Sequence, residues 1–476
     1  MRTLVWFRGK DLRLRDNRAL SEAVTQGEVI TVYVADPEVL CHKGYAQSPH
    51  RVTYLLGALE ELSESIRIKG GQLVVLRGKP EARLPRFVAK HQVDQVFAQR
   101  MSYPGAREQT KRLGAAIGVR LREFDGETLF APESIRNGSG KPYCVFTPFS
   151  KAARRSLELA RPLPFPRTLT APAATVLAEH QGLPSLAELG ICANPALVTA
   201  GERAALGRLR TFIDRTIARY DEARDILALA GTSRLSADLA FGTLSPRQVW
   251  YSVQSTVQPT AARERFLTQL LWREFAYSTL WNQPTLLTAP FLQKFNEFPW
   301  RRNPTDFEAW AQGQTGFPIV DAAARQLLRE GYVHNRARMI AASFLSKDLL
   351  LDFRLGEAHY LKYLVDGDLA LNDLGWQWAS GTGCDAQPYY RVFNPMTQGK
   401  KFDPFGDYVR TYVPELARLR TDDIHCPWQA DKLSLLAAGI RLGKDYPLAM
   451  VDHPSAHKRY LALTAEFLGK VNQPGR

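Results

Sequence analysis

The chain has 476 residues, of which 45% are hydrophobic and 10% aromatic, so it is long enough for at least two domains with separate cores. Its 62 basic and 48 acidic residues give a formal net charge of +14, which favours a polyanionic partner such as nucleic acid. No apolar run approaches the roughly 18 residues of a membrane span, and the charged N-terminus does not resemble a secretory signal, so we expect an intracellular, cytoplasmic protein.

Residues 1–130 alternate between short β-branched runs and helical patterns. The runs are TLVWF, VITVYVAD, QLVVLRG, DQVFAQ and VRLREFDG. Helical spacing is clearest at Leu55, Leu56, Leu59, Leu62 and Ile66. Strands that alternate with helical crossovers predict an α/β domain with a doubly wound, five-stranded parallel sheet. Because neither a glycine fingerprint nor a phosphate-binding loop occurs, the fold alone assigns no ligand.

Between residues 131 and 200 the periodicity fades and prolines accumulate, which indicates a long surface connector with a turn at NGSGKP. Residues 201–476 are helical almost throughout and contain eight of the nine tryptophans. We therefore predict a second, all-α domain that carries the chemistry. Its HxxxH pair, His453 and His457, contains Pro454, and none of the five cysteines forms a CxxC pair, so we expect no metal and no disulfide framework.

Two helical segments of this second domain carry mixed faces. In RERFLTQLLWREFAYSTLW, Gln269, Trp272 and Arg273 lie opposite an apolar stripe, and in HNRARMIAASF one stripe combines Asn335 and Met339 with an arginine. Such faces are either solvated, with an incidental aromatic residue, or they line a pocket for a flat heteroaromatic ligand.

Two further segments have the composition of binding loops. GTSRLS, residues 231–236, places hydroxyls at a predicted helix start, where they serve either as a phosphate site or as an ordinary cap. DGDLALNDLGWQW, residues 366–378, is rich in Asp and Gly, which are poor in helix interiors, so it predicts a ligand-lined turn. The alternative is a capped loop, with Asp366 or Asp368 as N-cap and Trp376 and Trp378 packed beneath it.

Seven motifs occur in an order that resembles the DNA photolyase and cryptochrome family. They are GTSRLSADLAFGTLSP, LLWREF, FPWRRNP, TGFPIVDAAARQL, HNRARMIAASFLSKDLL, DGDLALNDLGWQWASGTG and YYRVFNP. The resemblance extends from the first strand to about residue 420 and is greatest to cyclobutane pyrimidine dimer photolyases. It implies a monomeric flavoprotein lyase without an obligate protein partner, which uses blue light and reduced FAD to split pyrimidine dimers in UV-damaged DNA by electron transfer.

The resemblance implies that the all-α domain, residues 201–476, binds the FAD. The residues expected to contact it are Tyr220, Thr232, Ser233, Arg234, Leu235, Ser236, Gln269, Arg273, Asn335, Arg338, Asp366, Asp368 and Asn372. Arg338 would pair with Asp366 beside the isoalloxazine, and Asp368 would lie near the adenosine half. Asn372 would face flavin N5, where an uncharged carboxamide favours the anionic reduced form. Plant cryptochromes tend to carry Asp there, so Asn372 favours repair over signalling.

The resemblance also assigns the DNA contacts. Trp272 and Trp378 would stack on the flipped lesion, and Arg336 and Arg391 would contact phosphate or lesion. Gln269 stands where dimer photolyases usually have Glu, and Gln is typical of (6-4) photolyases and animal cryptochromes. The (6-4) enzymes, however, need a His pair at the positions of Asn335 and Met339. We give the missing histidines more weight and expect a dimer photolyase.

Electron supply and antenna depart from the family pattern. Trp376 and Trp300 match the ends of the tryptophan chain that reduces the flavin, but its middle position is Phe353, which is harder to oxidise. Tyr360 with Trp310 could bypass it. The segment AQRMSYPGAREQT lacks the Asn-Glu pair that holds folate, and WFRGKDLRL has one residue more than usual. The second chromophore thus stays open between a deazaflavin, a flavin and none.

Two other functions compete with dimer repair. A cryptochrome-like photoreceptor would share the flavin site but signal through a conformational change. A basic α/β nucleotide-binding protein without photochemistry would explain the first 130 residues, but it would not explain the ordered tryptophan motifs.

Overall fold

The computed structural model describes residues 1–40, 48–157 and 160–471, so Cys41 lies outside the described residues. The chain forms two compact units. Unit 1 consists of residues 1–221, 232–284 and 365–370, and unit 2 of residues 222–231, 285–364 and 371–476. The expected domain boundaries near 130 and 200 stay predictions.

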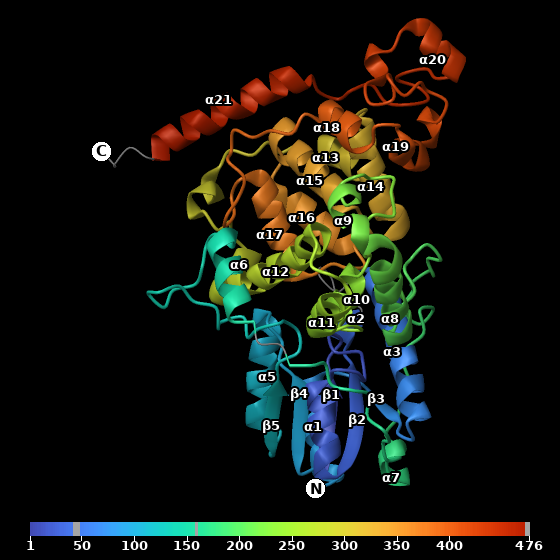
Figure 1. The fold of residues 1–476 in the computed structure, drawn as a ribbon, viewed down its shortest axis with the longest axis vertical. Helices are drawn as coiled ribbons and strands as arrows, with labels where there is room; N and C mark the ends of the chain where they lie inside the picture. The colour runs from blue at the N-terminus through green and yellow to red at the C-terminus, as the bar shows by residue number, and fades with distance from the viewer. Residues whose placement is uncertain (41–47, 158–159, 472–476) are drawn as a thin grey trace. The chain divides into compact units, whose positions relative to one another are not determined.

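Unit 1 contains the predicted five-stranded parallel sheet, in the order β3-β2-β1-β4-β5 (Figure 1). The strands are β1 (Arg2–Phe7), β2 (Glu28–Ala35), β3 (Leu73–Arg77), β4 (Gln95–Gln99) and β5 (Arg120–Phe124). Each one lies within or beside a run read from the sequence. The order reverses direction at β1, as expected for a doubly wound sheet.

Helices cover both faces of this sheet. Val5 and Phe7 point into a core with α1 (Arg18–Gln26) and α3 (Pro49–Ile68). Leu4 and Trp6 point into a second core with α4 (Pro80–Lys90) and α5 (Pro104–Ala116). Burial on both faces explains why these strands read as nearly continuous apolar runs and not as alternating ones. The five apolar residues expected on one helix are all buried on α3.

The predicted connector is largely irregular, and an isolated bridge from Arg136 to Pro142 closes the predicted NGSGKP turn. It also contains α6 (Phe146–Arg155), which the sequence did not predict. The other short or helical elements of the first 284 residues are α2 (Pro37–Leu40), α7 (Ala174–Leu177), α8 (Glu202–Thr211), η1 (Phe212–Thr216), η2 (Ile217–Arg219), α9 (Tyr220–Ala223), α10 (Ser236–Phe241), α11 (Pro246–Thr256) and α12 (Ala261–Asn282).

Unit 2 is helical, as expected, and its core surrounds α14, whose Ala322, Ala323 and Leu327 are fully buried. From residue 284 onward the elements are η3 (Pro284–Leu287), η4 (Gln293–Glu297), α13 (Pro304–Ala311), α14 (Pro318–Glu330), α15 (Asn335–Ser343), η5 (Phe344–Asp348), α16 (Phe353–Tyr363), α17 (Leu369–Ser380), α18 (Pro395–Phe402), α19 (Asp407–Tyr412), η6 (Pro414–Leu416), η7 (Pro427–Gln429), α20 (Lys432–Ala438) and α21 (His453–Val471). None of the helices in the described ranges is both long and apolar enough to cross a membrane.

The expectation of a turn throughout residues 366–378 is wrong, because α17 begins at Leu369 and continues to Ser380. Side-chain contacts compensate for the poor helix formers. The Asn372 Nδ2 atom donates to the main-chain carbonyl of Glu357 at 3.0 Å. Trp376 packs so closely on α16 that a Cβ atom at Gly356 would clash with the indole. Packing therefore overrides local propensity.

Candidate active site

Helix α12 carries three of the predicted site residues on one stretch. Thr260 caps its N-terminus by accepting a hydrogen bond from the Arg263 amide. Gln269 and Trp272 are half-buried, and Arg273 is buried. The mixed face of α12 is therefore partly shielded from solvent, which favours the interpretation that it lines a ligand site.

Trp272 has a partner that sequence reasoning missed. The Phe146 ring of α6 stacks on its indole, with ring centroids 3.7 Å apart and planes 9° from parallel. Phe146 lies in the proline-rich connector, where periodicity gave no signal. An additional base can stack on Trp272 only on the indole face opposite Phe146.

Asp368 is the centre of a buried polar network within unit 1. Its carboxylate accepts hydrogen bonds from the Lys10 ammonium at 2.7 Å and from the Tyr277 hydroxyl at 2.5 Å. The Arg273 guanidinium donates to the same hydroxyl, and Lys10 also pairs with Glu127 at 3.0 Å. Burial works to raise the pKa of Asp368, but Lys10 and Arg273 hold that pKa below its usual range. Lys10 thus gives the extra residue of WFRGKDLRL a structural role, and Asp368 is engaged by protein groups.

The TSRLS segment leads directly into α10, which confirms the predicted helix start at Ser236. Thr232 and Ser233 are half-buried, while Arg234 and Ser236 are exposed. Accessible hydroxyls beside an arginine are the donors that a diphosphate requires. The ring of buried Tyr220 packs edge-on against its aromatic neighbours. Leu235 is buried and holds the segment against the core.

Helix α15 carries the second mixed stripe. Asn335 is exposed and lies 3.8 Å from the Met339 sulfur, and half-buried Arg338 donates to the Val333 carbonyl at 2.7 Å. Arg336 is half-buried, pairs with Asp225 at 3.0 Å and covers the Phe402 ring. Because the Arg336 guanidinium is engaged, it is less available for phosphate than its sequence position implied.

Asn372 is 8% exposed, and its hydrogen bond to Glu357 fixes which way the carboxamide faces. Next to it, Asp373 accepts a hydrogen bond from Gln377 at 2.8 Å. Burial, together with repulsion between the Asp373 and Glu357 carboxylates, raises the pKa of Glu357, and burial raises the pKa of Asp373. Asp366 is also buried, but it belongs to unit 1 and Arg338 to unit 2, so their pairing stays a prediction.

The redox candidates cluster around Trp376. Its ring centroid lies 5.1 Å from that of Tyr360 and 5.9 Å from that of Trp310, and the latter two rings stack at 5.9 Å. Phe353 is buried with its centroid 6.4 Å from that of Trp300. Within the described residues the Tyr360 hydroxyl has no hydrogen-bond partner, and burial raises its pKa. Tyr360 and Trp310, which the sequence suggests as a bypass, are in ring contact, and each also packs against Trp376; the bypass itself stays a prediction.

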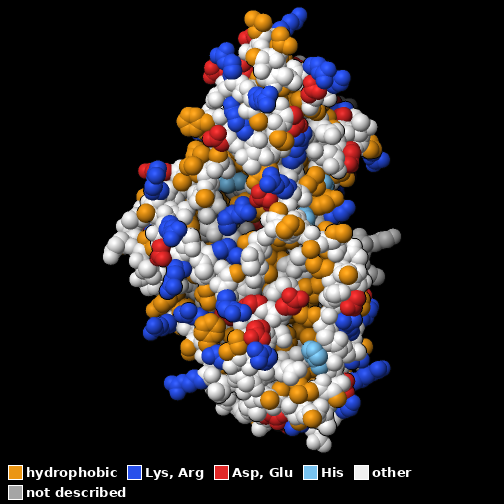
Figure 2. All heavy atoms as spheres, turned by 90° about the vertical axis from the view of Figure 1, so that its right-hand side faces the viewer, with side chains coloured by type: hydrophobic (Ala, Val, Ile, Leu, Met, Phe, Trp, Pro, Cys, Tyr) orange, Lys and Arg blue, Asp and Glu red, His pale blue; other side chains and the backbone are white. Residues whose placement is uncertain are grey.

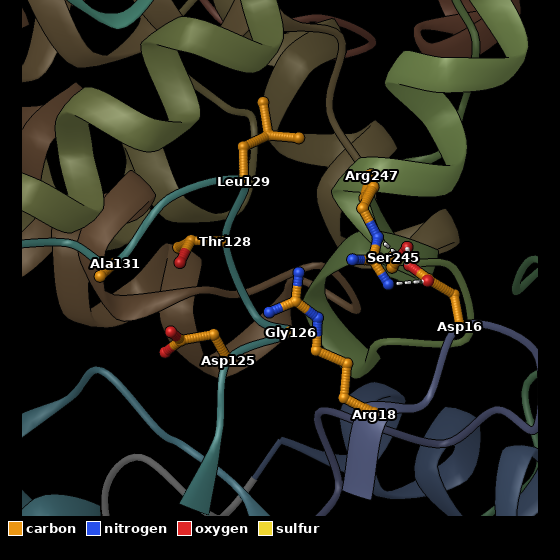
Figure 3. Close-up of a pocket in the computed structure, with 9 residues that line it drawn as sticks. All are labelled: Asp16, Arg18, Asp125, Gly126, Thr128, Leu129, Ala131, Ser245 and Arg247. Carbon is orange, nitrogen blue, oxygen red and sulfur yellow. Dashed lines mark hydrogen bonds and ion pairs between the residues drawn. The ribbon is translucent and has the colours of Figure 1, made fainter. Parts of the chain in front are cut away.

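A polar cavity of about 60 Å³ lies in unit 1 where β5 ends and α1 and α11 begin (Figure 3). The Arg18 guanidinium points into it, and Asp16 pairs with Arg247 and accepts from the Ser245 hydroxyl. None of the predicted site residues lines it. Ligand pockets usually measure roughly 300–1,000 Å³, so this cavity suits water molecules and not a chromophore.

Two family models match the chain. Residues 3–168 match the model described as DNA photolyase, and residues 266–466 match the model described as the FAD binding domain of DNA photolyase. The chain belongs to the DNA photolyase family. The flavin-binding residues expected from the resemblance within 266–466, from Gln269 to Asn372, therefore lie in the FAD-binding part of a photolyase.

Similar proteins extend this relationship over the whole chain. A deoxyribodipyrimidine photo-lyase of Agrobacterium fabrum is 41% identical over 97% of both chains. The crystal structure of a class III photolyase from Agrobacterium tumefaciens has a TM-score of 0.91 and 39% identity, and covers 98% of each chain. A cryptochrome from Synechocystis has a TM-score of 0.89 and 28% identity, with 97% of this chain and 99% of its own chain covered. These two Agrobacterium photolyases are more similar to the chain in sequence than this cryptochrome is, although the fold is shared by all three.

Proposed function

We propose that this photolyase splits cyclobutane pyrimidine dimers in DNA under blue light, with FAD as its cofactor. The residues on the surface of α15 are the observation that favours dimers over (6-4) photoproducts as the substrate. There Asn335 and Met339 stand where (6-4) repair needs a histidine pair, and neither side chain titrates near neutral pH. High identity to proteins named deoxyribodipyrimidine photo-lyase supports the same assignment.

The chain's own residues fit the flavin. Thr232, Ser233 and Ser236 would bind the diphosphate through their hydroxyls, and Arg234 would offset its charge. Asn372, oriented by Glu357, would present its carboxamide to the isoalloxazine edge without adding charge, which favours the anionic reduced form. When bound, FAD supplies the light-driven electron for the lesion.

The lesion would be held by stacking and by charge. Half-buried Trp272 and half-buried Trp378 would each stack on the flipped dimer, and the Phe146 ring covers one face of the Trp272 indole. Gln269 would donate a hydrogen bond to the dimer. Exposed Arg391 would contact a phosphate, and it is a better candidate than the engaged Arg336.

Electrons that reduce the cofactor from the protein side would come through Trp376 and Trp310. Tyrosine loses its phenolic proton when it is oxidised, and Tyr360 has no acceptor for it among the described residues. Tryptophan has no such strict requirement, and Trp310 lies against Trp376. We therefore favour Trp310 over Tyr360 as the stepping stone that replaces the missing tryptophan at Phe353.

The antenna would not be a folate. Arg107 belongs to the segment that lacks the Asn-Glu pair, and its guanidinium stacks 3.7 Å from the centre of the Trp281 ring. This side chain of the segment is therefore engaged by the protein itself. A second unit 1 cavity, of about 200 Å³ and lined by α4 residues, is also smaller than usual ligand pockets. Extraction of the purified protein should release FAD and no pterin, as checked by chromatography.

Repair of defined lesions tests the proposed function. Oligonucleotides with a cyclobutane dimer should be restored under blue light, and those with a (6-4) photoproduct should stay intact. Restored (6-4) bases with intact dimers would overturn the proposal. Loss of both activities, with a light-dependent change in shape or in oligomeric state, would favour the photoreceptor function of the cryptochrome relative. We also propose that the protein works as a cytoplasmic monomer.

A further inference from the structure

Lys347 is a lysine without any exposed surface, on the π-helical turn η5. Burying an ammonium group is costly unless it is hydrogen-bonded or paired. Within the described residues its Nζ atom makes one hydrogen bond, of 2.8 Å, and the acceptor is the main-chain carbonyl of Arg391. The Lys347 ammonium therefore binds the backbone of Arg391, and Arg391 is the residue whose side chain we assign to a DNA phosphate.

A second contact fixes the same segment. The amide of Phe393, two residues beyond Arg391, donates to the Ser343 hydroxyl at 3.4 Å, and the Arg391 amide donates to the Pro388 carbonyl at 2.9 Å. Ser343 ends α15 and Lys347 lies on the turn that follows it. The irregular segment before α18 is therefore bonded to Ser343 and to Lys347, while Arg391 itself is exposed.

The charged groups around Lys347 are few. Its neighbour Asp348 is engaged by His453 of α21, whose Nδ1 atom lies 2.5 Å from the carboxylate, and the Arg459 guanidinium donates to the Asp348 carbonyl. The Tyr460 ring, also on α21, faces the ammonium at 5.7 Å. His457 stacks beside His453. No carboxylate in the described part of the chain forms an ion pair with Lys347, so the Arg391 carbonyl is the hydrogen-bond acceptor of its ammonium, while the Asp348 charge acts on it without a direct bond.

We propose that Lys347 is a positioning residue for DNA binding, which holds the backbone of Arg391 so that the exposed guanidinium meets a phosphate of the damaged strand. The inference rests on the proposed function, because it requires that Arg391 contacts DNA. Such a contact is charge-assisted and sensitive to placement.

The same contact makes DNA binding depend on the protonation of Lys347. Burial lowers the pKa of Lys347 to about 7; the Asp348 carboxylate works against this shift, and the positive charge of Arg391 adds a smaller lowering. A phosphate on Arg391 offsets that charge, so the pKa of Lys347 rises on binding and the complex takes up a proton near pH 7. Affinity should consequently fall as pH rises above 7, because the proton must then be taken from a more alkaline solution.

The test compares the holoprotein with Lys347→Met, Arg391→Gln and Lys432→Met, the last altering an exposed lysine of unit 2 as a matched control. Binding to a dimer-containing duplex is measured against salt, and calorimetry at pH 7 in two buffers of different ionisation enthalpy counts protons. We expect Lys347→Met to lose the proton uptake, to weaken binding about tenfold, and to reduce the log-log salt slope by about 0.9, one phosphate, as Arg391→Gln does. The control should behave as wild type.

Each result has one meaning. An unchanged slope and proton count in Lys347→Met, with both reduced in Arg391→Gln, would overturn the inference and leave the proposed function intact. An unchanged slope in Arg391→Gln would remove the assigned DNA contact itself. If Lys347→Met fails to fold, Lys347→Gln takes its place, because it removes the ammonium and keeps a polar side chain; an unchanged salt slope in that variant overturns the inference, and the absence of buffer-dependent heat in the wild type overturns the proton linkage.

Discussion

Trp376 touches two aromatic residues that differ in what oxidation demands of them. Trp310 is sealed in the core and donates its indole N–H to the Ala341 carbonyl, whereas the Tyr360 hydroxyl has no partner in the described part of the chain. We expect Trp310→Phe to slow blue-light reduction of oxidised FAD at least tenfold, and Tyr360→Phe to leave the rate nearly unchanged. Absorbance of the bound flavin, followed under illumination with an external reductant, measures both rates.

The Phe353→Trp variant should show the opposite effect, a gain in the rate of flavin photoreduction. It restores a tryptophan whose centroid would be near Trp300, so photoreduction should accelerate. Dimer repair by protein that was reduced beforehand should be unchanged in all three variants, because repair does not use this route. A slow Tyr360→Phe and a normal Trp310→Phe would reverse our assignment.

Stacking predicts a lesion-specific loss at Trp378. Base–aromatic stacking contributes roughly 1–3 kcal/mol per base, so Trp378→Ala should weaken binding of dimer DNA by that amount and affect undamaged DNA much less. Fluorescence anisotropy with matched duplexes checks this. If damaged and undamaged DNA lost affinity equally, Trp378 would lie outside the lesion site.

Helices α16 and α17 meet at a pair of carboxyl groups, which makes their packing pH-dependent. Burial and mutual repulsion raise the pKa of Glu357, and burial raises that of Asp373. In the unfolded chain both groups lose their protons near pH 4, while the folded chain keeps them to higher pH. The folded state then binds more protons, so this pair lowers stability as pH rises from about 4 towards the raised pKa values.

Asp373→Asn should remove part of the loss of stability that occurs as pH rises, and the Asn side chain can still accept the Gln377 hydrogen bond. Relative to wild type, the variant should gain on the order of 1 kcal/mol more stability at pH 8 than at pH 5. Urea unfolding at both pH values measures the difference. Asp422→Asn, which changes an exposed carboxylate, should show none. An equal gain at both pH values would show that the effect is not titration.

These helices also show where the sequence was informative. Strands β1 to β4 and helix α12 were predictable, because burial imposes apolar runs or a helical period that can be read one segment at a time. Helix α17 was not, because its stability depends on Gly356 and Glu357 of another helix. Phe146 and Lys347 were likewise invisible, since nothing local in the sequence shows which distant group a side chain will contact. The motifs located the site residues, but contacts such as those of Asp368 with Lys10 required the structure.

At the scale of the whole molecule, the net charge of +14 bears on how DNA would be bound. Lys and Arg side chains are spread over the face shown in Figure 2, with acidic groups between them, and form no single continuous patch there. We expect DNA affinity to depend on a few placed groups, with a log-log slope of about −0.9 for each phosphate neutralised. Two such contacts already predict about a tenfold loss between 50 and 200 mM salt. Affinity independent of salt would contradict a phosphate-based interface.

The division of the chain into two interleaved units also has a consequence on the ribosome. Unit 1 needs residues 232–284 and 365–370, so its N-terminal sheet emerges long before its last segment is made. At a synthesis rate of about 5–20 residues per second, roughly 7–30 s separate residue 221 from residue 370. Until Asp368 is made, Lys10 lacks the carboxylate that accepts its hydrogen bond, and so does Tyr277 once it has been synthesised. Nascent chains stalled before Val365 should therefore expose the sheet domain in an incomplete, protease-sensitive form, and those released after Ala370 should not.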